Sequence, residues 1–377
     1  MSVEREFTEA NFMRATRHST MARVLAHVVA AELYSACPDV WNAPPRITAL
    51  ASQGWSNLTL RVDSDDNPES FILRLSERRA SPEAKRSRSN PQFEKERHVL
   101  GLLSSQTWAP KLIGPVSGVL NLNVPGHRES AYAFMLQSLI PFESARATQD
   151  RASRERVLER LASLARAIHA TPTSGYGVDY DETSGAFAHT WFSDFVDSNI
   201  KRLETSPLDF SMKRWLTARL EDLKSLAPEP RLFHRDLLGN WGNFLIDKDE
   251  NIRGVIDWEF AGSGPAFHYE IASLLYVLQR DGHSQEAINR DLHAVLRGYG
   301  MSLSTYQNDH ERYVETIVLM NSISALIKFS EIHRCGATSQ EPRRARFAER
   351  ASALCSSCYS RDRVTNHSVV VSRRLVA

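Results

Sequence analysis

The chain has 377 residues, of which 42% are hydrophobic and 24% are charged, and these values are typical of globular proteins and not of disordered or fibrous ones. Its 46 Lys and Arg residues balance 45 Asp and Glu residues, so no overall field draws it to nucleic acid or to an anionic membrane. The apolar runs are too short to span a bilayer and no signal-peptide pattern opens the chain, so we expect a cytoplasmic protein with more than one domain.

Residues 1–44 are expected to form a helical extension, because apolar residues between positions 21 and 33 recur at spacings of three and four. From Ile47 the pattern changes to short β-like runs separated by polar turns. These runs lie at residues 46–50, 58–62, 70–76, 109–124 and 130–140. A helical pattern over residues 92–105 follows the third run. We therefore predict a domain over residues 45–140 that consists of a five-stranded antiparallel sheet and one helix.

Residues 141–360 are expected to form a second, mostly helical domain. A helix over residues 151–170 places its apolar residues on one face. The expected exceptions are two short strands, "NFLID" and "IRGVIDW", which the turn "KDEN" joins into a ribbon. Residues 361–377 have no clear pattern and are expected to be a frayed tail. The predicted fold class is α+β, with a small sheet domain followed by a larger helical domain.

In the stretch "LFHRDLLGNWGNFLIDKDENIRGVIDWEFAG", residues 232–262, a His-Arg-Asp triplet precedes Asn240 and Asn243, and after a charged turn an Ile-Asp-Trp-Glu sequence follows. Transfer of a phosphoryl group to a hydroxyl group requires a carboxylate that accepts the hydroxyl proton, and oxygen ligands that hold Mg²⁺ against the phosphates. Asp236, in "HRD", suits the first task. Asp257, at the end of the strand "GVIDW", suits the second.

These motifs resemble those of the aminoglycoside phosphotransferase and choline kinase family. The chain matches the family pattern at "HRD", "NFLID" and "VIDWEFAG", and the Trp-Glu pair after Asp257 is similar to this family and not to protein kinases, which have Phe-Gly there. The resemblance implies a bilobal, protein-kinase-like fold, ATP or GTP as phosphate donor, Mg²⁺ as the metal, and a small-molecule hydroxyl group as acceptor. The charge balance, independently of the resemblance, leads us to expect no nucleic-acid or membrane partner.

The sequence departs from the family pattern in the catalytic loop. Trp241 stands five residues after Asp236, where the family has the metal-binding Asn. Asn240 comes one place earlier and Asn243 two places later. The family's hairpin register favours Asn243 as the second Mg²⁺ ligand beside Asp257, and Asn240 remains the alternative. The two extra residues would bulge from the loop, where Gly239 and Gly242 permit unusual φ angles.

The resemblance also implies that two segments of the sheet domain, one near its start in the sequence and one near its end, contact the nucleotide. The turn "SQGWSN" is similar to the family's turn between the first two strands, where Gly54 lets the backbone approach the triphosphate and Ser56 and Asn57 offer donors. The strand "FMLQSLI" resembles the linker between domains, so backbone groups around Gln137 and Leu139 are expected to bind the adenine edge.

Arg74, in "FILRL", occupies the position where kinases keep a basic residue on the third strand. A cation there bridges the phosphates and pairs with a carboxylate from the following helix. Glu96 is the preferred partner, because Val99, Leu100 and Leu103 lie on the same side of that helix. Glu94 is the alternative.

Two other residues are expected to have structural roles: His234 would orient the catalytic loop, and Glu270 would cap backbone donors. The acceptor is expected to bind among the helices after residue 180, where acidic and aromatic residues could recognise a cation. The candidates are Trp191, Phe192, Asp194, Asp197, Glu259 and Tyr269. The preferred function is a small-molecule kinase acting on an aminoglycoside-like antibiotic, as in antibiotic resistance, with choline-like, amino-acid and sugar acceptors left open. The alternative is a non-catalytic kinase-fold protein that binds nucleotide or ligand.

Overall fold

The structure, a computed structural model, describes residues 26, 28–50, 58–65, 67–77, 91–114, 118–122, 130–145, 151–334, 353, 355, 356 and 358–360. The expected tail over residues 361–377 lies outside this part of the chain. Contacts divide the chain into two compact units, which are described separately. Unit 1 consists of Met1–Ala145, Tyr180–Gly185 and Gly242–Ala261, and unit 2 of Arg146–Asp179, Ala186–Trp241 and Gly262–Ala377. Within the described ranges, no helix has both the length and the apolar character needed to cross a membrane.

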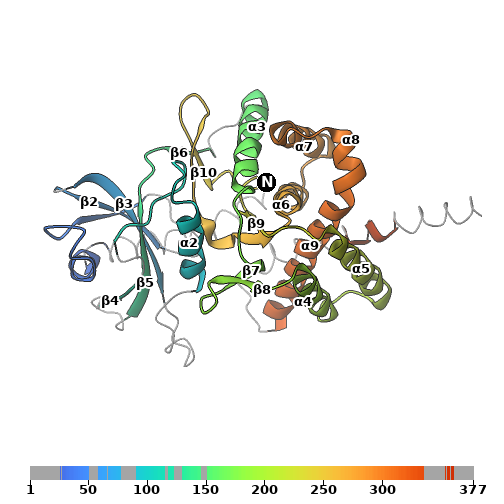
Figure 1. Cartoon of the computed structure of the whole chain (residues 1–377), viewed down its shortest axis with the longest axis horizontal. Coiled ribbons are helices and arrows are strands. Elements are labelled where there is room, and N and C mark those ends of the chain that lie inside the picture. The colour runs from blue at the N-terminus through green and yellow to red at the C-terminus, as the bar shows by residue number, and fades with distance from the viewer. Residues whose placement is uncertain are drawn as a thin grey trace, which may run out of the picture. The chain divides into compact units, whose positions relative to one another are not determined.

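Unit 1 contains the predicted five-stranded antiparallel sheet, with the strand order β1-β2-β3-β5-β4. Strands β2, β3, β4 and β5 of this sheet are labelled in Figure 1. Alternate residues of each strand point to opposite faces, so Leu73 and its neighbours at 71 and 75 are buried on one face while Arg74 lies on the other. The strands are β1 (Arg46–Ala49), β2 (Leu58–Ser64), β3 (Asn67–Glu77), β4 (Gly118–Leu122) and β5 (Ser130–Ser138).

Both faces of this sheet are covered by helices. On one face, Val29, Leu33 and Trp41, from the helix that includes residues 28–36 and the segment after it, share a hydrophobic core with the sheet. On the other face, Phe93 of α2 (Pro91–Leu102) packs with Met135 and its neighbours. Helix α2 therefore lies on the same face as Arg74, because Arg74 and Met135 are cross-strand partners.

The predicted ribbon is present in unit 1 as β10 (Phe244–Ile246) and β11 (Ile252–Val255), which pair antiparallel. A two-residue strand, β6 (Glu143–Ser144), adds to its edge. The chain then forms a 3-10 turn, η4 (Trp258–Phe260), whose Trp258 is fully buried near Trp108. The ribbon thus belongs to the unit of the sheet, although the expected boundary at residue 140 assigns it to the helical domain. The domain boundaries stay predictions.

Unit 2 is mostly helical, as predicted (Figure 1). Its helices begin and end at recognisable signals: Asp209 and Ser284 cap α5 and α7 with their side chains, and Gly282 and Gly300 end α6 and α7 with a positive φ. The helical segments are α3 (Arg151–Ile168), α4 (Phe192–Glu204), α5 (Phe210–Leu223), η3 (Lys224–Leu226), α6 (Ala266–Asp281), α7 (Gln285–Tyr299), α8 (Leu303–Thr305), the π-helix η5 (Tyr306–His310) and α9 (Glu311–Arg334).

The prediction of only two strands after residue 141 was wrong. A four-stranded sheet in the order β8-β7-β12-β9 lies among the helices of the second half. Its strands are β7 (Tyr176–Asp181), β8 (Ala186–His189), β9 (Arg231–Phe233) and β12 (Gly262–Gly264). The strand "GSG" has no apolar alternation to detect, because its pairing is decided by tertiary contacts with β7 and β9.

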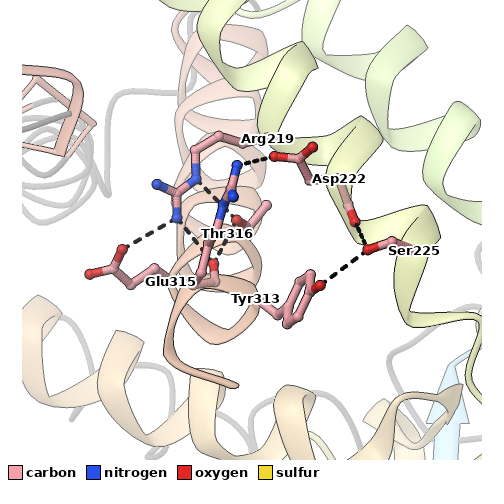
Figure 2. A network of polar contacts seen from close by, with 7 residues as sticks. Arg219, Asp222, Ser225, Tyr313, Glu315 and Thr316 are labelled. Atoms are coloured by element: carbon pink, nitrogen blue, oxygen red, sulfur yellow. Dashed lines mark hydrogen bonds and ion pairs between the residues drawn. The ribbon is translucent and has the colours of Figure 1, made fainter. Parts of the chain in front are cut away.

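A buried arginine joins α5 to α9, as Figure 2 shows. Arg219 Nε donates to Oγ1 of Thr316 at 3.2 Å, and Nη2 donates to the carbonyl oxygen of Arg312 at 3.0 Å and to Oε2 of Glu315 at 3.3 Å. The same two helices are also linked by an ion pair between Asp222 and Arg312. Because these groups of α9 accept hydrogen bonds from the buried guanidinium of α5, they fix the position of the two helices on each other.

Candidate active site

Arg74 on β3 lies among three carboxylates of unit 1. Its Nη1 donates to Oε1 of Glu96 on α2, and its Nη2 lies 3.1 Å from Oδ1 of Asp257 and 3.7 Å from Oε2 of Glu259. Burial by itself would lower the pKa of Arg74, but these carboxylates outweigh it and raise the pKa. The guanidinium is therefore a fixed cation that joins strand, helix and the segment after the ribbon.

The predicted pairing of Arg74 with Glu96 is present in the structure. Burial raises the pKa of Glu96 to about 7, although Arg74 opposes this effect. Glu94, the alternative, instead forms an ion pair with Arg97 at 2.6 Å. The contact of Arg74 with phosphates stays a prediction. Glu259 was expected to face the acceptor, but it is buried and belongs to the Arg74 cluster.

Asn243 and Asp257 lie at the same end of the ribbon. The last cross-strand pair is Phe244 with Val255, and beyond it the amide of Ile256 donates to the carbonyl oxygen of Asn243 at 2.9 Å. Asp257 follows with φ 67° and ψ 58°, a left-handed conformation that is uncommon for a residue other than glycine. Its side chain is 35% exposed. One carboxamide and one accessible carboxylate are the hard oxygen donors that Mg²⁺ prefers, so the donor set fits this ion.

In unit 2, Asp236 lies on a loop whose backbone is held by Glu270 of α6. The amide of Arg235 donates to Oε1 of Glu270, and Arg235 has a φ of 72°. Such a conformation costs about 1–3 kcal/mol in a residue with a side chain, so the surrounding contacts must enforce it. Burial raises the pKa of Glu270 to about 7, while hydrogen bonds from the loop backbone oppose the rise. Glu270 therefore caps the loop before Asp236, whereas the sequence did not identify which donors it would cap.

Asn240 contacts Asp236 directly. Its Nδ2 donates to Oδ2 of Asp236 at 2.9 Å, and its backbone amide donates to the carbonyl oxygen of Leu237 at 3.3 Å. His234, which is fully buried, accepts a long hydrogen bond of 3.4 Å at Nδ1 from the amide of Asp236. The carboxamide of Asn240 is thus engaged with the candidate base, whereas Asn243 lies at the end of the ribbon.

The expected role of Gly239 was wrong, because this residue does not adopt a positive φ. A Cβ atom at Gly239 would lie 2.9 Å from Cγ2 of Val277 and 3.3 Å from the carbonyl oxygen of Ser273, both on α6. Glycine is required here because the loop backbone approaches the helix closely. Within residues 232–262, positive φ angles occur instead at Arg235 before the loop, at Glu250 in the turn of the ribbon and at Asp257 after the ribbon.

The other residues predicted to contact the nucleotide come from the segment before β2 and from the end of β5. Gly54, Ser56 and Asn57 lie outside the described residues. Gln137 is buried near the end of β5 as the partner of Ile72. The amide of Leu139 donates to the carbonyl oxygen of Ser70 at 3.0 Å, so this donor already serves the sheet. The adenine contact of this segment stays a prediction.

The candidates for acceptor binding fall into two groups in unit 2. Tyr269 is buried and stacks on Phe233 with ring centroids 4.6 Å apart, and Phe192 is buried as well, so both serve the core. In contrast, Trp191 is 67% exposed at the start of α4, and Asp194 and Asp197 are exposed on the first turns of that helix. Asp197 also forms an ion pair with Lys224 at 2.7 Å.

The sequence matches a family described as phosphotransferase enzyme family over residues 46–313. No curated protein matches it significantly by sequence. Solved structures share the fold at low identity. The aminoglycoside phosphotransferase APH(4)-Ia superposes with a TM-score of 0.57 at 18% identity, covering 88% of this chain and 99% of that one.

Two further structures broaden the comparison. A complex of amicoumacin kinase with AMP-PNP, Ca²⁺ and Ami has a TM-score of 0.53 at 15% identity, covering 82% of this chain and 88% of that one. An ethanolamine kinase from Plasmodium vivax has a TM-score of 0.52 at 13% identity, covering 84% of each chain. These matches confirm the expected kinase-like α+β fold.

Proposed function

The chain belongs to the phosphotransferase enzyme family, and on this premise we propose that it transfers the γ-phosphate of ATP or GTP to a hydroxyl group of a small, cationic acceptor such as an aminoglycoside. The observation that carries the proposal is the cluster in which Arg74 joins Glu96 to Asp257. Kinases pair a basic residue of the third strand with a carboxylate of the following helix, and this cation contacts the phosphates.

Asp236 is the proposed catalytic base. The acceptor hydroxyl oxygen forms a bond to the γ-phosphorus, the bond from this phosphorus to the β–γ bridging oxygen breaks, and the nucleoside diphosphate leaves with the bonding electron pair. The hydroxyl proton passes to the Asp236 carboxylate. No covalent enzyme intermediate is needed, because Asp236 acts by orienting the hydroxyl group and removing its proton.

Asn243 and Asp257 are the proposed ligands of Mg²⁺, which would neutralise the charge of the phosphates when bound. Their common position at the end of the ribbon supports this assignment over Asn240, whose carboxamide donates to Asp236. Arg74 is the proposed phosphate contact, oriented by Glu96. Gly54, Ser56 and Asn57, with the backbone near Gln137 and Leu139, remain the proposed contacts to the rest of the nucleotide.

The acceptor class is inferred from the aromatic and acidic side chains that are exposed at the start of helix α4. Trp191 is largely exposed there, the carboxylate of Asp194 is exposed on the first turn, and Asp197 is exposed on the next turn, where it pairs with Lys224. An aromatic face and carboxylates together favour a ligand that carries ammonium groups. We therefore rank hydroxylated amines, including aminoglycosides, above neutral sugars as acceptors.

The test is a phosphorylation assay with purified protein, Mg²⁺ and ATP or GTP, over a panel of aminoglycosides, choline-like amines, amino alcohols and sugars. Product is detected by its mass increase of one phosphate group. Asp236→Ala should abolish turnover and keep nucleotide affinity, whereas Asp257→Ala should also weaken Mg²⁺-dependent nucleotide binding measured by calorimetry. Wild-type rates in either variant would contradict the role assigned to it.

The second candidate function is a kinase-fold protein that binds nucleotide without transferring phosphate, which the lengthened catalytic loop favours. Nucleotide binding without any phosphorylated product across the panel, and without phosphate release to water, would support this alternative. Product formation that depends on Asp236 would exclude it.

A further inference from the structure

The loop between Asp236 and Asn243 carries two more residues than the family pattern, and the structure shows what holds this longer loop. Asn240 and Trp241 lie in its middle. Asn240 reaches back to the carboxylate of Asp236 at 2.9 Å. A carboxamide that donates to one carboxylate oxygen restricts rotation of the aspartate side chain, so the position of Asn240 directly affects the orientation of the base.

Trp241, the next residue of this loop, contacts a cation from helix α3. The guanidinium carbon of Arg154 on α3 lies 4.7 Å from the centroid of the Trp241 ring. This distance is well within the range of a cation–π interaction, for which tryptophan is the best aromatic partner. The Arg154 side chain is 25% exposed, so the contact is only partly screened by water.

Arg154 is itself fixed by a buried carboxylate on α7. Its Nε and Nη2 both donate to Oδ2 of Asp291, at 2.9 and 2.6 Å, and Asp291 is almost fully buried. Two donors on one acceptor orient the plane of the guanidinium, which lysine could not do. The cation that faces Trp241 is therefore a preorganised group.

The helices that supply this cation and its carboxylate pack closely on each other. A Cβ atom at Gly298 of α7 would lie 2.1 Å from the carbonyl oxygen of Glu159 of α3, so the two backbones are in direct contact there. Groups supported by packed helices are held more accurately than groups supported by loops alone.

We propose that Asp291, Arg154 and Trp241 form an anchor that fixes the lengthened loop and, through the adjacent Asn240, positions the carboxylate of Asp236 for phosphoryl transfer. These four are positioning residues, and the proposal deepens the proposed function and rests on it.

The anchor is tested first by amide hydrogen exchange in the full-length protein, which needs no substrate. In the wild type, opening of the loop must break the cation–π contact, and Arg154→Met and Trp241→Leu each remove this contact. The amides of residues 237–241 should therefore exchange about tenfold faster in both variants than in the wild type. Arg160→Met removes an exposed arginine from the same helix and should leave these amides unchanged. Trp241→Phe and Arg154→Lys keep an aromatic face and a cation respectively, and should restore part of the protection.

The catalytic consequence is tested with Mg²⁺ and ATP, with water as the acceptor and phosphate release as the readout. Arg154→Met, Trp241→Leu and Asn240→Ala should each lower kcat about tenfold, because the base is misaligned, while KM for ATP changes less than about twofold. Arg154→Lys and Trp241→Phe should recover part of kcat. The double variant Arg154→Met/Trp241→Leu should be no worse than either single one, since both remove the same contact.

The outcomes separate this proposal from the proposed function. Wild-type exchange rates in both Arg154→Met and Trp241→Leu would overturn the anchor, and so would faster exchange with an unchanged kcat. If the wild-type protein transfers phosphate to no acceptor, including water, the proposed function fails and the exchange rates alone decide whether the anchor exists. Arg154→Met removes both hydrogen bonds to Oδ2 of the buried Asp291 and leaves it, among the described residues, only the ion pair with Arg290 at 3.6 Å, which destabilises the fold; Trp241→Leu keeps Arg154 and Asp291 intact and therefore keeps the test decisive.

Discussion

Replacement of Glu270 by Gln should raise the free energy of unfolding relative to that of the wild type by a larger amount as the pH increases. Burial raises the pKa of Glu270 from its ordinary value of 4.5 to about 7. Because the folded protein then binds this proton more tightly than the unfolded chain does, the free energy of unfolding falls between pH 4.5 and pH 7. Each pKa unit corresponds to about 1.4 kcal/mol, so ionisation of Glu270 costs the folded wild type about 2 kcal/mol between pH 5 and pH 8.

Glutamine has nearly the same shape, does not ionise, and its amide oxygen can still accept from the amide of Arg235. The difference in unfolding free energy between Glu270→Gln and the wild type should therefore shift by about 2 kcal/mol in favour of the variant from pH 5 to pH 8. Urea unfolding followed by circular dichroism at several pH values measures it. Glu204→Gln, on the exposed surface of α4, controls for the loss of a negative charge. A difference for Glu270→Gln that stays constant over this pH range would refute the reasoning.

Three further substitutions test the packing that supports the site. Arg74→Met should destabilise the protein by about 3–5 kcal/mol because it leaves Glu96 buried without a cation, and the double variant Arg74→Met/Glu96→Leu should recover part of this loss in thermal unfolding. Gly298→Ala should lower the melting temperature by several degrees, because the added methyl group meets the backbone of α3. Gly101→Ala is the control, because nothing lies within 4 Å of a Cβ atom there, and this variant should be neutral or stabilising. Equal melting temperatures in the two variants would contradict the close approach of α7 to α3. Arg219→Met should cost about 2–3 kcal/mol in urea unfolding because it removes the charged hydrogen bonds between α5 and α9, and a loss below 0.5 kcal/mol would show that these bonds add nothing.

Elements with a long and regular pattern could be predicted from the sequence. The alternation around Leu73 and the helical spacing in residues 151–170 are local properties, and both elements are present. The pairing of Arg74 with Glu96 was also predictable, because the strand and the helix each show which face is apolar. Short strands such as "GSG" could not be predicted, since their partners lie far away in the chain.

The sequence by itself determined the order of the chemical groups: the candidate base in "HRD", an asparagine before the ribbon, and a carboxylate after it. Only the tertiary structure decided what each group contacts. Arg74 and Asp257 are 183 residues apart in the chain yet in contact, and Arg154 of α3 contacts Trp241 of the loop after Asp236. The physical reason is that a side chain's neighbours, and therefore its charge state and orientation, depend on which distant surfaces pack together, and no local pattern encodes that packing.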